Sequence, residues 1–156
     1  MAKGFSQVHV LHFDEIFAPV VMLRSIQMIL VIAALHDYEI WQMDVNTTFL
    51  NQFLKEDLYL VQPVGFTNPK NPKKECKLKR SIYGLKQASM SWNHRFDHVI
   101  LEYGFTRSVE EPFLDIKSSG SKIVFLVLYV YDIFLIRNDI LLLSSVIVWL
   151  QNHFQI

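Results

Sequence analysis

Residues Ile123–Ile136, with the sequence IVFLVLYVYDIFLI, decide how this chain folds. β-Branched and aromatic residues dominate the stretch, and the polar pair Tyr131 and Asp132 interrupts it near its middle. This pattern predicts two strands that meet in a tight hairpin around the polar pair. The hairpin therefore carries a carboxylate, Asp132, at its tip.

The segments around the hairpin show helical and extended patterns. Apolar residues recur at helical intervals in three places, which predicts amphipathic helices. These helices cover Met22–Leu35, Ser91–Tyr103 and Ile140–Phe154. Residues Tyr38–Val45 form an extended segment that leads into a short helix over Asn46–Leu54.

Composition narrows the class of protein. The chain has 156 residues, the size of one domain, and 51% of them are hydrophobic, which excludes a disordered tail. Fifteen cationic and fifteen acidic residues balance, so any attraction for nucleic acid must be local. The proline-containing loop Thr67–Lys74 divides the sequence into two blocks.

No segment has the features of a membrane span. The apolar part of Ile123–Ile136 is shorter than the roughly 20 residues that cross a bilayer, and Ile16–Leu35 contains Pro19 and Arg24. We therefore expect no membrane partner. A single cysteine, Cys76, cannot form an internal disulfide, which favours an intracellular protein.

Two carboxylates stand at the ends of apolar strands. Asp44 ends the run Ile40–Val45, and Asp132 lies within the hairpin. On local grounds Asp44 is more easily explained as a cap of the next helix. Alternatively, the two carboxylates converge on a divalent metal, since magnesium takes few protein ligands and keeps waters and substrate phosphates for the rest. Spacing leaves both interpretations open.

Longer motifs carry a resemblance to a known family. The run QMDVNTTFLN at Gln42–Asn51 is similar to the copia-type sequence QMDVKTAFLN, and SIYGLKQA at Ser81–Ala88 is similar to SLYGLKQA. Further matches occur in the same order at Ala2–Gln7, Phe17–Val21, Gln62–Pro63 with Gly65–Phe66, and Leu128–Val130. Over residues 1–156 the chain resembles part of the reverse transcriptase domain of a copia-type retrotransposon. The family domain extends beyond both ends of this sequence, so we expect a truncated domain.

The resemblance implies an α+β fold, a polymerase fingers and palm with an antiparallel sheet backed by helices. It also implies that magnesium is held by Asp44, Asp132 and the backbone carbonyl of Val45. The incoming deoxynucleotide would be bound by residues of the two long motifs, with an aromatic ring beneath the sugar at Phe49. The nucleotide-binding set carried over in this way is Thr48, Phe49, Tyr83, Gly84 and Lys86.

One position departs from the family in its chemistry. Tyr129–Asp132 reads YVYD where the family reads YVDD, so Tyr131 replaces a metal-binding aspartate. Tyrosine is neutral at pH 7 and a poor magnesium ligand. A carboxylate worth about 4 kcal/mol in the transition state corresponds to roughly a thousandfold in rate. Because neighbouring residues of a strand face opposite ways, we expect that Asp132 does not replace it.

Local positive charge suggests a contact with nucleic acid. Cations concentrate in one short region, and these residues could follow a template or primer backbone: Lys70, Lys73, Lys74, Lys77, Lys79, Arg80 and Lys86. A solvated loop explains them equally well.

Three hypotheses follow. The chain is a catalytically inactive relic of an RNA-directed DNA polymerase that used an RNA or DNA template-primer, it is a non-catalytic nucleic-acid-binding fragment, or it is an unstable product of a decayed gene. Arg137, where the family usually has glycine, fits such drift.

Overall fold

The computed structural model describes residues 2–8, 21–51, 53–54, 56–109, 111 and 114–156. The predicted family match at 17–20 lies outside these residues. The chain forms two compact units, one from Met1–Ala18 and Phe49–Trp92, the other from Pro19–Thr48 and Asn93–Ile156. The proline-containing loop lies inside the first unit, so it does not separate the two.

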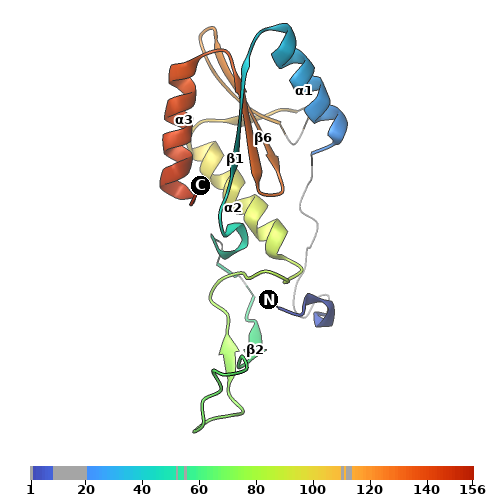
Figure 1. The fold of residues 1–156 in the computed structure, drawn as a ribbon, viewed down its shortest axis with the longest axis vertical. Helices are drawn as coiled ribbons and strands as arrows, with labels where there is room; N and C mark the ends of the chain where they lie inside the picture. The colour runs from blue at the N-terminus through green and yellow to red at the C-terminus, as the bar shows by residue number, and fades with distance from the viewer. Residues whose placement is uncertain (1, 9–20, 52, 55, 110, 112–113) are drawn as a thin grey trace. The chain divides into compact units, whose positions relative to one another are not determined.

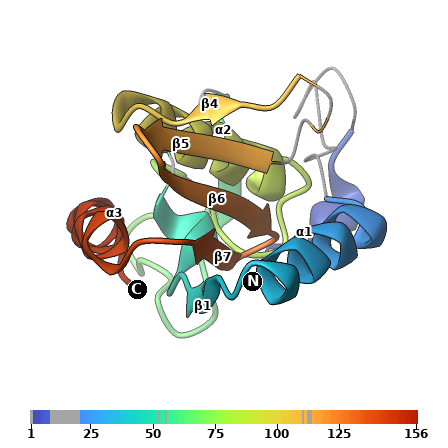
Figure 2. The same ribbon diagram turned by 90° about the horizontal axis from the view of Figure 1, so that it is seen from above.

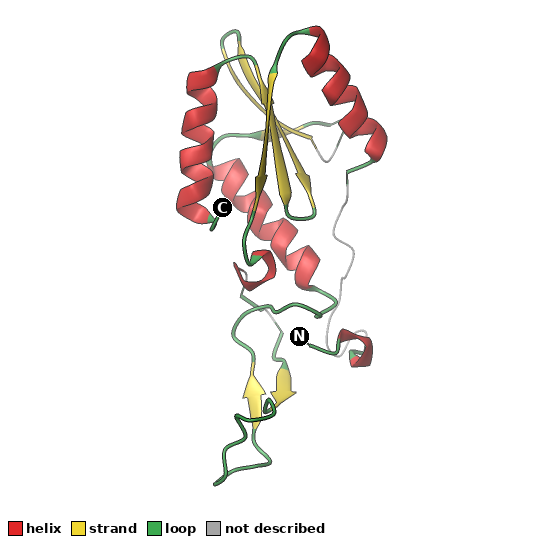
Figure 3. Cartoon of the chain, in the orientation of Figure 1, coloured by secondary structure: helices red, strands yellow, loops and turns green. Residues whose placement is uncertain are grey.

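The second unit is built on a five-stranded sheet (Figures 1 and 3). Every neighbouring pair is antiparallel. The order across the sheet is β1 (Glu39–Asp44), β7 (Asp132–Arg137), β6 (Lys122–Tyr129), β5 (Leu114–Ser119) and β4 (Thr106–Arg107). With the three α-helices of the described residues, this confirms the predicted α+β class and the antiparallel sheet.

Helices cover the two faces of this sheet. Helix α1 (Leu23–Leu35) packs Ile29 and Ala33 against Val127 and Ile136, which side chain alternation places on one face. Helix α3 (Ile140–His153) contacts β6 and β7 and lies on the other side (Figure 1). Predicted and observed boundaries of both helices agree to within one residue.

Helix α2 (Ala88–Glu102) begins three residues earlier than predicted and ends before Gly104. Gly104 has φ +88°, a backbone conformation that suits glycine, and the chain turns there as predicted. Within the second unit, the ring of Phe96 stacks on Phe154, with 5.8 Å between the ring centroids. Phe96 is fully buried, so this contact fastens α2 to the segment after α3.

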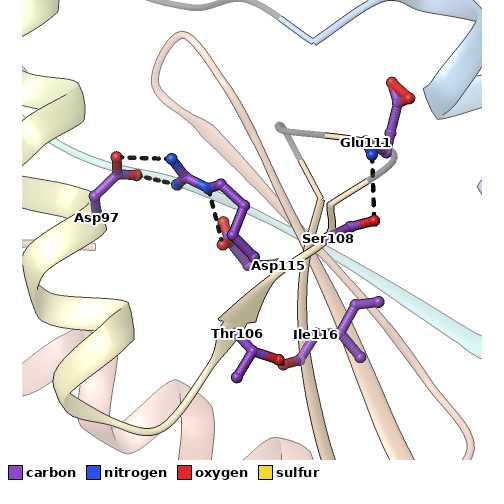
Figure 4. A network of polar contacts seen from close by, with 7 residues as sticks. Asp97, Thr106, Ser108, Glu111, Asp115 and Ile116 are labelled. Carbon is purple, nitrogen blue, oxygen red and sulfur yellow. Dashed lines mark hydrogen bonds and ion pairs between the residues drawn. The ribbon is translucent and has the colours of Figure 1, made fainter.

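An ion-pair network joins α2 to the β4 edge of the sheet (Figures 2 and 4). Arg107 donates two hydrogen bonds to Asp97, at 2.6 and 3.1 Å, and one of 3.4 Å to Asp115. The hydrogen bonds that Arg107 donates to Asp97 raise the pKa of Arg107 despite its partial burial. Burial raises the pKa of Asp115, and Arg107 offsets part of that rise. We interpret the network as structural, because each of its charged side chains is paired with another member of the network.

The first unit contains a small core and a two-stranded hairpin. Leu58, Leu85 and Ala88 form the buried centre. Strands β2 (Tyr59–Val61) and β3 (Glu75–Lys77) pair antiparallel. Two single turns of 3-10 helix complete the elements, η1 (Gly4–Ser6) and η2 (Thr48–Asn51).

The short helix predicted over Asn46–Leu54 is reduced to η2. Thr47 has φ +50°, outside the right-handed helical region, so helix cannot begin at Asn46. No helix in the described part of the chain is long and apolar enough to cross a membrane.

Candidate active site at the hairpin tip

The register of the sheet places the two predicted carboxylates opposite each other. Strand β1 pairs with β7 so that Asp44 faces Asp132. Directly opposed residues of antiparallel strands project from the same face, with Cβ atoms about 5 Å apart. The structure therefore brings together the catalytic pair that the sequence predicted from two distant segments.

Solvent reaches this pair. Asp44 is exposed and Asp132 is half-buried. Asp132 accepts a 3.0 Å hydrogen bond from the side-chain amide of Gln42, which lies on the same face two residues before Asp44. Neither carboxylate has an ion pair among the described residues. Water around the two carboxylates thus offsets the free-energy cost of placing their charges at the ends of apolar strands.

The helix-cap interpretation of Asp44 does not hold. Helix η2 begins four residues later, at Thr48, so Asp44 lies too far upstream to be its N-cap. The Thr48 hydroxyl instead donates a 2.6 Å hydrogen bond to the carbonyl of Val45.

The tip of the hairpin differs by one residue from the prediction. Tyr129 pairs with Asp132, so Val130 and Tyr131 form the two-residue turn and Asp132 opens β7. Strand alternation therefore does not decide how Tyr131 and Asp132 face each other, because Tyr131 is outside the strand. The expectation that Asp132 does not replace the carboxylate lost at Tyr131 therefore loses its stated reason and stays a prediction, while the register puts Asp132 and Asp44 on one face. Tyr131 itself is 48% exposed.

Backbone strain is concentrated beside the two carboxylates. Val130 has φ +59° and Thr47 has φ +50°, left-handed conformations that are rare for β-branched residues. They lie two residues before Asp132 and three after Asp44. A positive φ at the first turn residue is usual for glycine in hairpins. Each such conformation costs about 1–3 kcal/mol and is typical of functional sites.

Backbone hydrogen bonds fix the chain after Asp44. The Val45 amide donates to the Tyr131 carbonyl at 3.2 Å, which extends the strand pairing into the turn. The Asn46 amide donates to the carbonyl of Gln155 at 2.7 Å. The segment after α3 thus supports the loop that carries Asp44 and Val45. Sequence patterns missed both Gln42 and Gln155, because contacts across the sheet leave no local signal.

The donor set can be compared with what magnesium requires. Magnesium takes six oxygen ligands and commonly only one or two carboxylates, the rest being water and phosphate. Asp44 and Asp132 supply two carboxylates, and the Val45 carbonyl keeps one lone pair beside its bond from Thr48. Within the described ranges no group of three His, Cys, Asp or Glu side chains could hold a metal. Two carboxylates and a carbonyl are donors of the kind that magnesium takes.

The other predicted nucleotide-binding residues belong to the first unit. The rings of Phe49 and Tyr83 meet edge to face, 5.0 Å apart. Phe49 also packs against the core of that unit, while Tyr83 stays 40% exposed. Gly84 has φ +92°, and a Cβ on Gly4 would collide with its carbonyl oxygen. The N-terminal segment therefore lies directly against the Tyr83 and Gly84 backbone.

Gln7 anchors the remaining predicted residue, Lys86. The Lys86 amide donates to the Gln7 side-chain oxygen at 2.8 Å, and its ammonium donates to the Gln7 carbonyl at 3.2 Å. The Gln7 amide donates to Gln87 at 3.0 Å. The sequence did not reveal these contacts of Gln7 with a predicted site residue, although the match at Ala2–Gln7 contained it.

The predicted basic contacts lie before and after β3 in the same unit. Lys73, Lys74, Lys79 and Arg80 are all exposed. The Arg80 guanidinium lies over the ring of Phe53, 5.0 Å from its centroid. No ion pair of these four cations occurs among the residues that the structure describes.

The sequence of this chain is similar to those of known proteins. The family described as reverse transcriptase (RNA-dependent DNA polymerase) matches residues 1–156. The retrovirus-related Pol polyproteins from transposons RE1 and RE2 of Arabidopsis thaliana are 36% and 35% identical over the whole chain, which covers 11% of each. The corresponding polyprotein from transposon TNT 1-94 of Nicotiana tabacum is 39% identical over 89% of the chain and 10% of the relative. The chain thus spans about a tenth of these relatives, and no solved structure matches it.

Proposed function

The chain belongs to the reverse transcriptase (RNA-dependent DNA polymerase) family, and from this we propose that it is a reverse transcriptase relic inactivated at Tyr131. The family assignment confirms the resemblance seen in the motifs. The observation that carries the proposal is the opposed pair Asp44 and Asp132, with a tyrosine in the adjoining turn. The scaffold for the chemistry is retained, while one acidic group is replaced.

The remaining residues have separate tasks in this proposal. Asp44, Asp132 and the Val45 carbonyl would hold magnesium, which when bound activates the primer hydroxyl and stabilises charge on the phosphate. Gln42 holds Asp132 in place through its amide. In the other unit, Phe49 and Tyr83 would form an aromatic surface for the sugar, with Gly84 and Lys86 as further nucleotide contacts. Thr48, in the unit of the carboxylates, would be a separate nucleotide contact.

Tyr131 disables this arrangement for two reasons. Its side chain has no carboxylate, so it cannot share the charge of two divalent ions with Asp44. Its ring is also larger than a carboxylate, and it stands exposed beside the carboxylate pair. Both effects act on the transition state rather than on folding, because an exposed turn residue contributes little to the core.

We expect the purified chain to show no templated primer extension with magnesium and deoxynucleotides. Its product yield should equal that of Asp44→Ala, which removes one carboxylate of the pair. Denaturing gel analysis of a labelled primer measures this. Extension that Asp44→Ala abolishes would contradict the proposal, because the retained pair would then be sufficient for catalysis.

A second candidate is a nucleic-acid-binding fragment without the chemistry, favoured by the exposed cations of the first unit. Fluorescence anisotropy with labelled template-primer is expected to show binding that weakens steeply with salt. Changing Lys73, Lys74 and Lys79 to alanine together should lower the slope of log affinity against log salt by about 2 to 3. An unchanged slope would contradict the proposal that the chain is a nucleic-acid-binding fragment.

The third hypothesis, an unstable product, makes the opposite prediction about the sheet. Leu126, Ile133 and Leu135 are completely buried in the central strands. Amides of such strands exchange slowest in a folded protein. A chain with no protected amides there would support the unstable product over both other hypotheses.

A further inference from the structure

One side chain organises the long connection between β2 and β3. The Gln62 amide nitrogen donates to the carbonyls of Asn71, Pro72 and Lys74, at 3.0, 3.3 and 2.8 Å. Its oxygen accepts a 2.8 Å hydrogen bond from the Asn68 amide. A single residue at the start of the connection thus holds four backbone groups spread along it.

The loop needs such an organiser because of its sequence. Pro63, Pro69 and Pro72 have no amide hydrogen and cannot form ordinary turn hydrogen bonds as donors. The Asn68 side chain accepts from the Lys70 amide at 2.9 Å and adds a local turn. Most of the segment is exposed, so no core packing fixes its shape. Backbone hydrogen bonds form local turns within the loop, and those of Gln62 join its start to its end.

Positive charge on this loop is not neutralised locally. Residues 62–80 contain six cationic residues and one acidic residue, within a chain of zero net charge. Lys70, Lys73 and Lys74 are exposed and have no ion pair within the described part of the chain. Lys77, by contrast, pairs with Asp57 at 2.7 Å. Three of the cations without an ion pair in the described part of the chain therefore lie on the loop that Gln62 holds, and two more, Lys79 and Arg80, follow β3.

The same loop also presents an aromatic ring to solvent. The Phe66 amide donates to the Pro63 carbonyl at 3.0 Å, and Gly65 has φ +86°, as in a type II turn. The turn leaves Phe66 81% exposed and Val64 99% exposed. An exposed phenylalanine on a loop that also carries three exposed lysines has the side chains of surfaces on which unpaired bases stack.

We propose that this loop binds single-stranded nucleic acid, with Lys70, Lys73 and Lys74 on the phosphates and Phe66 stacked on a base. Gln62 is the positioning residue that holds the loop in its binding conformation. The inference rests on the proposed nucleic-acid binding of the chain and specifies where and in what form the strand is bound. Preorganisation favours binding, because the loop does not have to be ordered when the strand arrives.

The test uses the full chain and fluorescence anisotropy with labelled oligothymidine and with a blunt duplex. Phe66→Ala is expected to weaken binding to the single strand about tenfold and to leave duplex binding unchanged, since only unpaired bases can stack. Phe5→Ala is a matched control, because Phe5 is 82% exposed in the same unit and lies outside the loop. It should change neither affinity.

Gln62→Met tests the positioning role, since methionine has a similar length and no hydrogen-bonding amide. We expect single-strand affinity to fall several-fold while the salt dependence stays the same, because every lysine remains. Hydrogen exchange at the Asn68 amide should accelerate, and exchange in the five-stranded sheet should not. A loss of affinity together with a lower salt slope would contradict this role.

The outcomes separate this inference from the proposed binding function. If neither Phe66→Ala nor Gln62→Met changes single-strand affinity while the triple lysine change does, binding stands and the proposed loop surface is wrong. If no variant changes affinity, both fail. If Phe66→Ala instead releases the chain from anionic vesicles and leaves oligonucleotide binding unchanged, the loop is a lipid contact and the inference is overturned.

Discussion

Tyr131→Asp is expected to raise magnesium-dependent primer extension about a thousandfold over the unmodified chain. The substitution places a third carboxylate in the two-residue turn beside the opposed pair Asp44 and Asp132. Two-metal phosphoryl transfer depends on carboxylates that hold both ions close together. A gain of about 4 kcal/mol in transition-state binding corresponds to this change in rate.

Tyr131→Asn provides the matched control for this experiment. Asparagine has the shape of aspartate and no charge, so it removes the bulk of the phenol without supplying a metal ligand. We expect it to stay at the background rate. Equal primer-extension activity of the two variants would show that the bulk of the Tyr131 ring, and not the missing charge, prevents catalysis. If Tyr131→Asp showed no primer extension, this would contradict the claim that one substitution accounts for the loss of polymerase activity.

Metal binding gives a measurement that does not depend on turnover. Manganese can replace magnesium at carboxylate sites, and its free fraction is measured by electron paramagnetic resonance. Tyr131→Asp should bind manganese at least tenfold more tightly than Tyr131→Asn. Asp44→Ala in the Tyr131→Asp background should reverse this gain, because Asp44 would share the ion.

Arg137→Met is expected to raise the free energy of unfolding by about 1 to 3 kcal/mol. Arg137 is 1% exposed in β7, and its ion pair is a 2.7 Å contact with Glu39. Its Nε and Nη1 atoms have no hydrogen-bond partner among the described residues. Burying a guanidinium with two unsatisfied donors costs more than one ion pair returns, so an apolar side chain of similar length should be favoured.

Removing Glu39, the ion-pair partner of Arg137, should lower the free energy of unfolding. Glu39→Ala leaves the buried charge of Arg137 without its counter-ion and should lower the free energy of unfolding by about 2 kcal/mol, less than for a fully buried pair because Glu39 is half exposed. Urea denaturation measures both changes. The double variant should be close to Arg137→Met alone. A destabilising Arg137→Met would show that the ion pair stabilises the sheet.

The sequence predicted most of the local structure, because the decisive signals are local. The periodicity of Met22–Leu35 and Ile140–Phe154 located α1 and α3 to within one residue. The apolar run broken at Tyr131 and Asp132 located the hairpin, with an error of one residue at its tip. That error arose because the turn requires a positive φ at Val130, which the identity of a β-branched residue does not suggest.

The candidate site was predictable only in part. Long motifs pointed to Asp44, Asp132, Phe49 and Lys86, whereas Gln42 and Gln7 were missed. Both missed residues act through side-chain amides on partners about 80 or 90 positions away. The groups that Gln62 contacts are closer to it along the sequence. The pattern of a glutamine before a proline-containing loop nevertheless does not indicate that the glutamine holds the loop.

By itself the sequence determined the family, the α+β class and the departure at Tyr131, since these depend on residue identity and on periodicity along the chain. Only the tertiary structure decided that Asp44 and Asp132 share a face, that Arg137 is buried and that Gln62 holds the basic loop. The physical reason is register. Shifting β1 by one residue against β7 would turn Asp44 to the other face with no change in sequence, and the packing of the whole sheet fixes that choice.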